Sequence, residues 1–170
     1  MDLSTFIRDV PDFPKAGILF KDIMPLLQDP AALHYTVDRL AEFSLERRPD
    51  VILGAEARGF ILGAAVAYSV GAGFVAARKP GKLPWHVSSA EYALEYGVDT
   101  LEMHIDAVKP GQRVIIHDDL LATGGTAKAK IDLVEQAGGV VVGLAFVIEL
   151  AFLGGRDKLQ GYDVLSLITY

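Results

Sequence analysis

Five short runs of apolar and β-branched residues recur along the chain, and their continuity constrains the fold more than any other feature. The runs cover residues 51–56, 73–78, 113–118, 140–150 and 163–168. A strand with one face in water alternates apolar and polar residues, whereas a continuous apolar run suits a strand that is covered on both faces, as in parallel sheets. The chain is therefore expected to build a mostly parallel sheet.

Helical patterns lie between these runs. Asp29 is a good N-cap and Pro30 follows at the first helical position, after which apolar residues repeat at helical spacing over 33–41. Further helices are predicted over residues 58–70 and over residues 125–137, the latter stopped by two glycines. Strands that alternate with helices imply right-handed crossovers, and we therefore predict an α/β fold with a doubly wound, mostly parallel sheet.

Ligands of doubly wound sheets bind beyond the carboxyl ends of the strands. This rule selects three loops, at residues 56–59, 78–82 and 118–126. Two segments stand outside the alternation of strands and helices. Residues 1–28 are expected to form an N-terminal helix and a proline-punctuated flap, and residues 82–105 a flexible lid, because long insertions at strand ends often close over a site.

Composition limits the classes of partner. The chain has 170 residues, of which 51% are hydrophobic, so one folded domain over residues 1–170 is expected. Its net charge of −6 comes without a basic block, which argues against nucleic acid as a partner. Cysteine is absent and the four histidines show no metal-ligand spacing, so no protein-held metal site is predicted.

The first residues lack the basic and apolar regions of a secretion signal. Residues 59–77 are uncharged and nearly long enough to span a bilayer, but glycines at positions 71 and 73 divide them where a helix would pass into a strand. A buried helix followed by a buried strand explains this segment better than a membrane span. We therefore expect no membrane partner and a cytoplasmic location.

The stretch VIIHDDLLATGGT, residues 114–126, carries the clearest chemistry. Its turn contains small residues that let backbone N–H groups approach a ligand, and the following helix points its positive end at the same place. This turn consists of Ala122, Thr123, Gly124, Gly125 and Thr126. Because the lysine of a nucleotide P-loop is missing, the turn predicts a site for a monophosphate.

The two carboxylates before the turn, Asp118 and Asp119, would repel a phosphate. They suit acceptance of hydrogen bonds from vicinal hydroxyl groups, or a position facing a metal-bearing group. A phosphate and two acceptors a few residues apart outline a ribose 5-phosphate. The simpler alternative is an ordinary strand-to-helix turn with a capping aspartate, but a cap needs one carboxylate and leaves Thr-Gly-Gly-Thr unexplained.

At this point the sequence resembles a known family. VIIHDDLLATGGT is similar to the phosphoribosyl pyrophosphate (PRPP) signature of type I phosphoribosyltransferases. The segments DFPKAGILFKDIMPLLQDP, EARGFILG, RKPGKLP, YALEYG and ELAFLGGRDKL narrow the resemblance to adenine phosphoribosyltransferases and extend it over residues 13–159. There are two departures from the family pattern. His117 stands where an aliphatic residue is usual: pointing into the sheet it needs a buried partner, and pointing outward it could tune Asp118. Pro80 stands where relatives often carry a basic residue, so one of several pyrophosphate contacts is not expected here.

The resemblance implies an enzyme of purine salvage that converts adenine and PRPP into AMP and pyrophosphate. Mg²⁺ is expected to arrive bound to PRPP, with few or no protein ligands. In the family a non-proline cis peptide lies in the first loop, here between Glu56 and Ala57, and a homodimer is expected. Basic residues at the ends of the first two strands are the expected pyrophosphate contacts: Arg58, Arg78, Lys79 and Lys82. The alternative for these residues is a solvated loop, and it applies most to Lys82. Arg78 is also the candidate for reaching the partner's site.

The resemblance also assigns residues around the base. Glu95 of YALEYG is the candidate acid/base and Tyr96 would cover the closed site, the alternative being a solvated glutamate on a two-stranded arm. Adenine contacts are expected in the flap and on the opposite side of the base, although apolar flap residues could equally belong to the core. These candidates are Leu19, Phe20, Lys21 and Leu150.

Three other functions deserve comparison. Another purine or xanthine phosphoribosyltransferase would share the phosphate site. A regulator that binds PRPP without catalysis would carry a DNA-binding segment, for which 170 residues leave no room. A dinucleotide-binding oxidoreductase is suggested by the glycine pattern at residues 71–76, but there it precedes a strand, whereas the dinucleotide fingerprint follows one.

Overall fold

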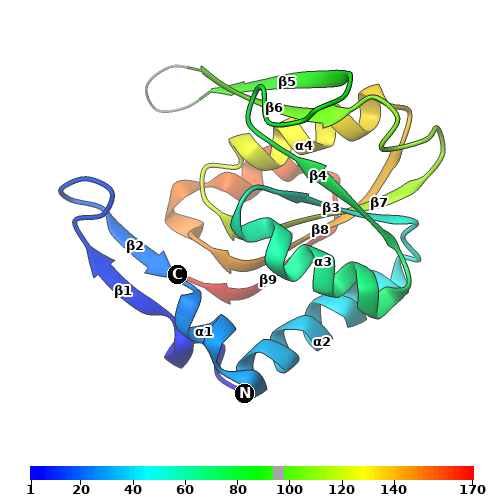
Figure 1. Ribbon diagram of the computed structural model, residues 1–170. Helices are drawn as coiled ribbons and strands as arrows, with labels where there is room; N and C mark the ends of the chain where they lie inside the picture. Colours follow the sequence, from blue (N-terminus) through cyan, green and yellow to red (C-terminus); the bar gives the residue numbers. More distant parts are fainter. Residues whose placement is uncertain (94–97) are drawn as a thin grey trace.

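The computed structural model describes residues 1–93 and 98–170, and a five-stranded sheet lies at its centre (Figure 1). The strands, in their order across the sheet, are β4 (Gly73–Ala77), β3 (Val51–Ala55), β7 (Arg113–Leu121), β8 (Val140–Glu149) and β9 (Val164–Thr169). All four pairings are parallel. This confirms the predicted doubly wound sheet, whose order reverses between β3 and β7. The reversal is where such sheets bind ligands.

Helices cover both faces of this sheet (Figure 1). α2 (Pro30–Glu46) and α3 (Arg58–Val70) lie on one face and α4 (Gly125–Gln136) on the other. The predicted start of α2 is confirmed, because the Asp29 carboxylate accepts a hydrogen bond from the Ala32 N–H at 2.8 Å. α3 ends at Gly71, which adopts a φ of 70° that suits glycine.

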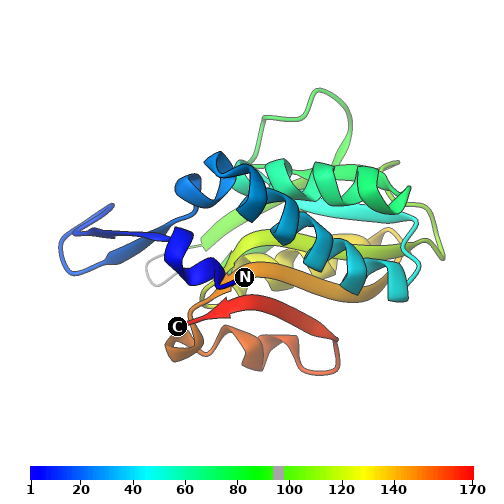
Figure 2. The same cartoon turned by 90° about the horizontal axis from the view of Figure 1, so that it is seen from below.

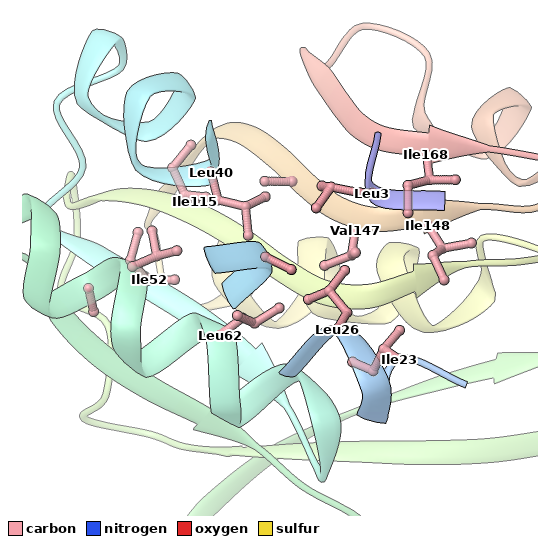
Figure 3. Packing of buried hydrophobic residues seen from close by; sticks show 14 residues of the cluster. Leu3, Ile23, Leu26, Leu40, Ile52, Leu62, Ile115, Val147, Ile148 and Ile168 are labelled. Carbon is pink, nitrogen blue, oxygen red and sulfur yellow. The ribbon is translucent and has the colours of Figure 1, made fainter. Parts of the chain in front are cut away.

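Most buried apolar side chains on the α2 and α3 side form one cluster (Figure 3). Ile52 and Ile115 come from the central strands, and Leu40 and Leu62 come from the two helices. All four side chains are fully buried. Complete burial of such a side chain contributes about 1.5–3 kcal/mol, so this cluster fixes the strand ends on which the loops are mounted.

Two antiparallel hairpins stand apart from the sheet. The first, β1 (Arg8–Pro11) with β2 (Leu19–Asp22), extends away from the body of the molecule (Figure 2). Short helical turns flank it: η1 (Leu3–Phe6) and α1 (Met24–Gln28). The second, β5 (Val87–Ala93) with β6 (Val98–His104), lies against α4, and its buried residues join those of α4 in a second apolar cluster.

The predicted end of the third strand was wrong. It was placed at Asp118, but β7 continues to Leu121 because β8 supplies pairing partners as far as Glu149. Asp118 and Asp119 therefore belong to the strand, and only residues 122–124 connect it to α4. The other four strands and the helices α3 and α4 end within one residue of the predicted positions, whereas α2 continues to Glu46, beyond the apolar pattern over 33–41.

The uncharged segment 59–77 divides as predicted into α3 and β4. Across residues 1–93 and 98–170, none of the helices combines the length and the apolar character that a bilayer crossing requires.

Candidate active site

A cavity of about 380 Å³ opens at the carboxyl ends of β3 and β7, within the range of small-molecule sites. Two stretches supply most of its wall, residues 55–58 after β3 and residues 118–127 from β7 into α4. Lys79 and Tyr92 complete the opposite side. The location is the one that the reversal in strand order predicts. Because β3 and β7 are neighbours, their following loops meet over one space.

The turn at residues 122–126 forms one wall of this cavity. Gly124 precedes α4 with a φ of 77°, and its carbonyl accepts the N–H of Lys128 at 2.9 Å. The first N–H groups of a helix have no partner within it, so the turn offers donors and a positive dipole end to an anion. The predicted anion turn thus lies in the cavity.

A second glycine segment supports this turn from behind, and the sequence analysis assigned it no role. A Cβ on Gly155 would lie 2.1 Å from the Ala122 carbonyl oxygen, and a Cβ on Gly124 would lie 2.4 Å from the Gly155 oxygen. Only residues without side chains permit this approach. The Gly154-Gly155 pair in ELAFLGGRDKL was the available signal, since adjacent glycines often mark close backbone contact.

The two carboxylates line the cavity and have different partners. Asp119, 8% exposed, binds the Arg58 Nε at 2.8 Å. Asp118 binds the Lys130 Nζ at 2.7 Å with Oδ2, and its Oδ1 accepts the Asp119 N–H at 3.1 Å. Burial, followed by the charge of Asp118, raises the pKa of Asp119 to about 7, although Arg58 and Lys130 act in the opposite direction.

Lys130 was missed by the sequence analysis. Its side chain is fully buried, whereas Lys128, two residues earlier in α4, is 47% exposed and pairs with Asp132. Its position on the helix could have indicated its burial, because Lys130 shares with Ala127 and Ile131 the face that turns toward the sheet. A lysine on an apolar helix face rarely occurs without a buried anion.

The question raised by His117 has an answer in the structure. Its ring is buried, and Nδ1–H donates a hydrogen bond to the Ala145 carbonyl at 3.0 Å. Burial lowers the pKa of His117 to about 4, so the ring is neutral at neutral pH. Nε2 has no hydrogen-bond partner within the described part of the chain. His117 therefore has the buried partner that the first alternative required, and it does not line the cavity.

The four predicted basic contacts occupy different places. Arg58 and Lys79 line the cavity, whereas Arg78 and Lys82 do not. Arg78 binds the Glu56 carboxylate at 2.7 Å and donates to the Lys82 carbonyl at 3.1 Å. The peptide bond between Glu56 and the following alanine is cis, as the resemblance implied.

Lys79 is held by the β5–β6 hairpin. Its Nζ donates to the Tyr92 hydroxyl at 2.8 Å and pairs with Asp99. Hydrogen bonding from Lys79 holds the pKa of Asp99 below its usual value. Lys79 thus joins the cavity to the β5–β6 hairpin near the ends of its strands at Ala93 and Val98, within the predicted lid segment.

The predicted base contacts lie near the cavity and outside its wall. The Phe20 ring on β2 is 4.9 Å from the Arg58 guanidinium carbon. Lys21 pairs with Asp9 at 2.7 Å, and Leu19 is 49% exposed. Leu150 donates its N–H to the carbonyl of Leu121 at the end of β7. Glu95 and Tyr96 lie outside the described residues.

Comparisons with known proteins agree with this geometry. A model of the phosphoribosyl transferase domain matches residues 23–166. An adenine phosphoribosyltransferase from Solibacter usitatus (strain Ellin6076) is 58% identical over 169 residues, which cover 99% of this chain and 98% of the relative. The solved adenine phosphoribosyltransferase of Thermoanaerobacter pseudethanolicus ATCC 33223 superposes with a TM-score of 0.97 at 55% identity, covering 99% of this chain and 98% of that one.

The Saccharomyces cerevisiae enzyme, solved with adenine and D-2,5-dideoxy-2,5-imino-altritol 1,6-bisphosphate, has a TM-score of 0.91 at 40% identity and covers 98% of this chain and 96% of its own. These matches favour the adenine enzyme over another purine or xanthine phosphoribosyltransferase and over a regulator without catalysis. The chain therefore belongs to the type I phosphoribosyltransferase family, among its adenine phosphoribosyltransferases.

Proposed function

We propose that PRPP lies in the cavity with its 5-phosphate on the turn at residues 122–126 and its ribose against Asp118 and Asp119. The observation that carries this proposal is the position of both features on one continuous element. The carboxylates lie in the last part of β7, which ends at Leu121, and the turn begins three residues after Asp119. A sugar with a phosphate at one end and hydroxyl groups at the other fits that spacing.

The enzyme forms AMP and pyrophosphate from adenine and PRPP. A ring nitrogen of adenine forms a bond to the anomeric carbon of ribose, and the bond from that carbon to the pyrophosphate oxygen breaks with its electron pair leaving on pyrophosphate. Positive charge develops on the ribose during this exchange. Asp118 and Asp119 accept hydrogen bonds from the ribose hydroxyl groups, and the negative charge of the pair favours the developing cation.

Arg58 and Lys79 bind the pyrophosphate end of PRPP in this arrangement. Each is now held by an aspartate, Arg58 by Asp119 and Lys79 by Asp99. A pyrophosphate group carries more charge than a carboxylate and presents several oxygens, so it competes for both cations. Release of Arg58 leaves Asp119 available to the ribose.

Mg²⁺ enters as part of the substrate, bound to PRPP, where it offsets charge on the leaving group. Within residues 1–93 and 98–170, no group of three or more His, Cys, Asp or Glu side chains is arranged to hold a metal ion. The two cavity aspartates each have a basic partner, Lys130 or Arg58. The protein's own part is to hold the ribose and the pyrophosphate.

Adenine enters between the flap and the end of β8. The segment Leu19–Lys21 contacts one side of the base and Leu150 the other, and Phe20 already lies against Arg58 at the mouth of the cavity. The yeast relative was solved with adenine together with a sugar bisphosphate analogue, which supports adjacent sites for base and sugar. Glu95 moves a proton on the base and Tyr96 covers the closed site, as the family resemblance implies.

A homodimer in which Arg78 reaches the partner's site stays a prediction from the resemblance. A cytoplasmic location stays a prediction from the sequence. Arg78 is held by Glu56 within its own chain, so that role requires the pair to open.

The placement of the ribose is tested by the double variant Asp118→Asn with Asp119→Asn. It removes both charges with little change in volume, and turnover is expected to fall below detection while circular dichroism and thermal unfolding show a folded protein. Asp132→Asn, on the α4 surface, is the matched control and should keep wild-type kinetics. Near-normal turnover of the double variant would refute the placement.

The role of Glu95 is tested separately. Glu95→Ala should lower kcat far more than it weakens equilibrium binding of PRPP, because the carboxylate acts on the base rather than on the sugar. An unchanged kcat would remove Glu95 from the mechanism. Offering adenine, guanine, hypoxanthine and xanthine together, and identifying the nucleotide formed, tests base selection in the same preparation.

A further inference from the structure

Lys130 is a buried charge for which the reaction described above has no use. Its side chain, on α4, has no exposed surface, and Nζ lies 2.7 Å from Asp118 Oδ2 and 3.4 Å from the His117 carbonyl oxygen. Burying an ammonium group is costly unless it is paired and hydrogen-bonded. An apolar side chain at this helix position would avoid that cost, so the charge itself requires an explanation.

The two cavity aspartates differ in the accessibility of their cations. Arg58, the partner of Asp119, is 33% exposed and lines the cavity, so a phosphorylated ligand can draw it away. Lys130 lies behind Asp118, outside the cavity wall, where no ligand reaches it. Asp118 therefore keeps its cation throughout a catalytic cycle, whereas Asp119 exchanges its own.

Asp118 is also held in one orientation. Lys130 engages Oδ2, and Oδ1 accepts the Asp119 N–H at 3.1 Å. Oδ1 also lies against Gly59, where an added Cβ would be 2.7 Å away. A carboxylate with these contacts cannot turn freely about its side-chain bonds. The neutral His117 ring adds no charge to this arrangement.

We propose that Lys130 is a positioning residue for the ribose. It acts through Asp118, whose carboxylate it holds in one orientation toward the sugar when the ligand takes Arg58. Without Lys130, Asp118 loses the buried cation on Oδ2 and keeps only the Asp119 N–H on Oδ1, so its carboxylate is free to turn. The inference rests on the ribose placement proposed above.

The measurement is discrimination between AMP and its 2′-deoxy and 3′-deoxy forms, by equilibrium binding to the full-length protein. Lys130→Met keeps an unbranched side chain, one heavy atom shorter, and removes its charge. For each deoxy form, discrimination is the ratio of its dissociation constant to that of AMP. At least one of these two ratios should fall by about tenfold in Lys130→Met, the size expected when a hydrogen bond to a charged group is lost. Lys128→Met, on the exposed side of the same helix, is the control and should keep both wild-type ratios.

Two further measurements distinguish this positioning role of Lys130 from a purely structural one. Because Lys130 acts through Asp118, Lys130→Met should cause no further fall in discrimination when added to Asp118→Asn. Thermal unfolding shows whether each variant is folded. If Lys130→Met does not fold, Lys130→Gln, which keeps a donor near Asp118, takes its place, with the same direction of change expected.

The outcomes distinguish this inference from the ribose placement. If Asp119→Asn and Asp118→Asn both keep wild-type discrimination, the ribose does not lie against these carboxylates and both proposals fall. If those variants lose discrimination while a folded Lys130 variant keeps it, only the role of Lys130 is overturned. A further loss on adding Lys130→Met to Asp118→Asn also overturns it, since the effect would not pass through Asp118.

Discussion

Replacing Gly155 with alanine tests how strictly the turn at residues 122–126, the proposed site of the 5-phosphate, is held in place. The new Cβ would lie 2.1 Å from the Ala122 carbonyl oxygen and 2.9 Å from the Gly124 nitrogen, where ordinary contact begins at 3.4 Å. One of the two backbone segments must therefore move by more than about 1 Å, since overpacked atoms separate rather than overlap.

The turn at residues 122–126 is the segment expected to move. Arg156, next to Gly155, donates from Nε to the buried Glu149 at 2.9 Å and so anchors its segment to β8. A displacement of about 1 Å in a positioning element costs about 100-fold in rate. We expect kcat/KM for PRPP to fall by about that factor, with an accompanying loss of about 1–3 kcal/mol in the free energy of unfolding.

Steady-state kinetics with PRPP varied at saturating adenine measures the effect, and thermal unfolding confirms the fold. Gly73→Ala is the control, because a Cβ there meets its nearest atoms at 3.7 and 3.9 Å, in ordinary contact. If Gly155→Ala kept kcat/KM for PRPP within twofold of the wild type, the turn would not depend on this close approach, and the reasoning would be wrong.

Contacts in the structure support three other predictions. His117 is neutral and buried in the folded protein, where burial lowers its pKa to about 4, so the unfolded chain binds a proton more readily. The free energy of unfolding should therefore fall by about 3 kcal/mol as pH falls from 6.5 to 4, and urea unfolding of His117→Val should lack this part of the pH dependence. Asp99→Asn should tighten PRPP binding up to about fivefold in calorimetry, because Lys79 no longer has to leave a carboxylate; weaker binding would contradict the proposed exchange. Asp29→Ala should cost about 1 kcal/mol of stability in thermal unfolding and leave kcat unchanged, since it removes only the α2 cap.

The arrangement of charges explains how an acidic chain binds a highly charged anion. Each cavity aspartate has its own basic partner, Lys130 for Asp118 and Arg58 for Asp119, and a third cation, Lys79, is tied to Asp99. In the proposed PRPP site, carboxylates therefore hold the cations in place, and a phosphorylated ligand would displace the carboxylates from Arg58 and Lys79. Such paired cations avoid the repulsion that a bare acid pair would present to PRPP.

Local sequence determined much of this protein. Continuous apolar runs identified five parallel strands, because a strand covered on both faces has no polar side to show. Asp29 indicated the start of α2, because an N-cap side chain bonds to residues that follow it closely in the chain. The glycines after Asp119 predicted a turn before a helix N-terminus, because such a turn needs only a short stretch of chain, and that turn lies at the cavity.

Only the tertiary structure decided which partners these residues have. Asp118 and Lys130 are 12 residues apart, yet their pairing depends on how α4 packs on the sheet, and Gly155 meets the turn only because β8 returns beside β7. The extension of β7 to Leu121 likewise required a partner strand. Contacts of this kind depend on packing between elements, and no local pattern of residues encodes them.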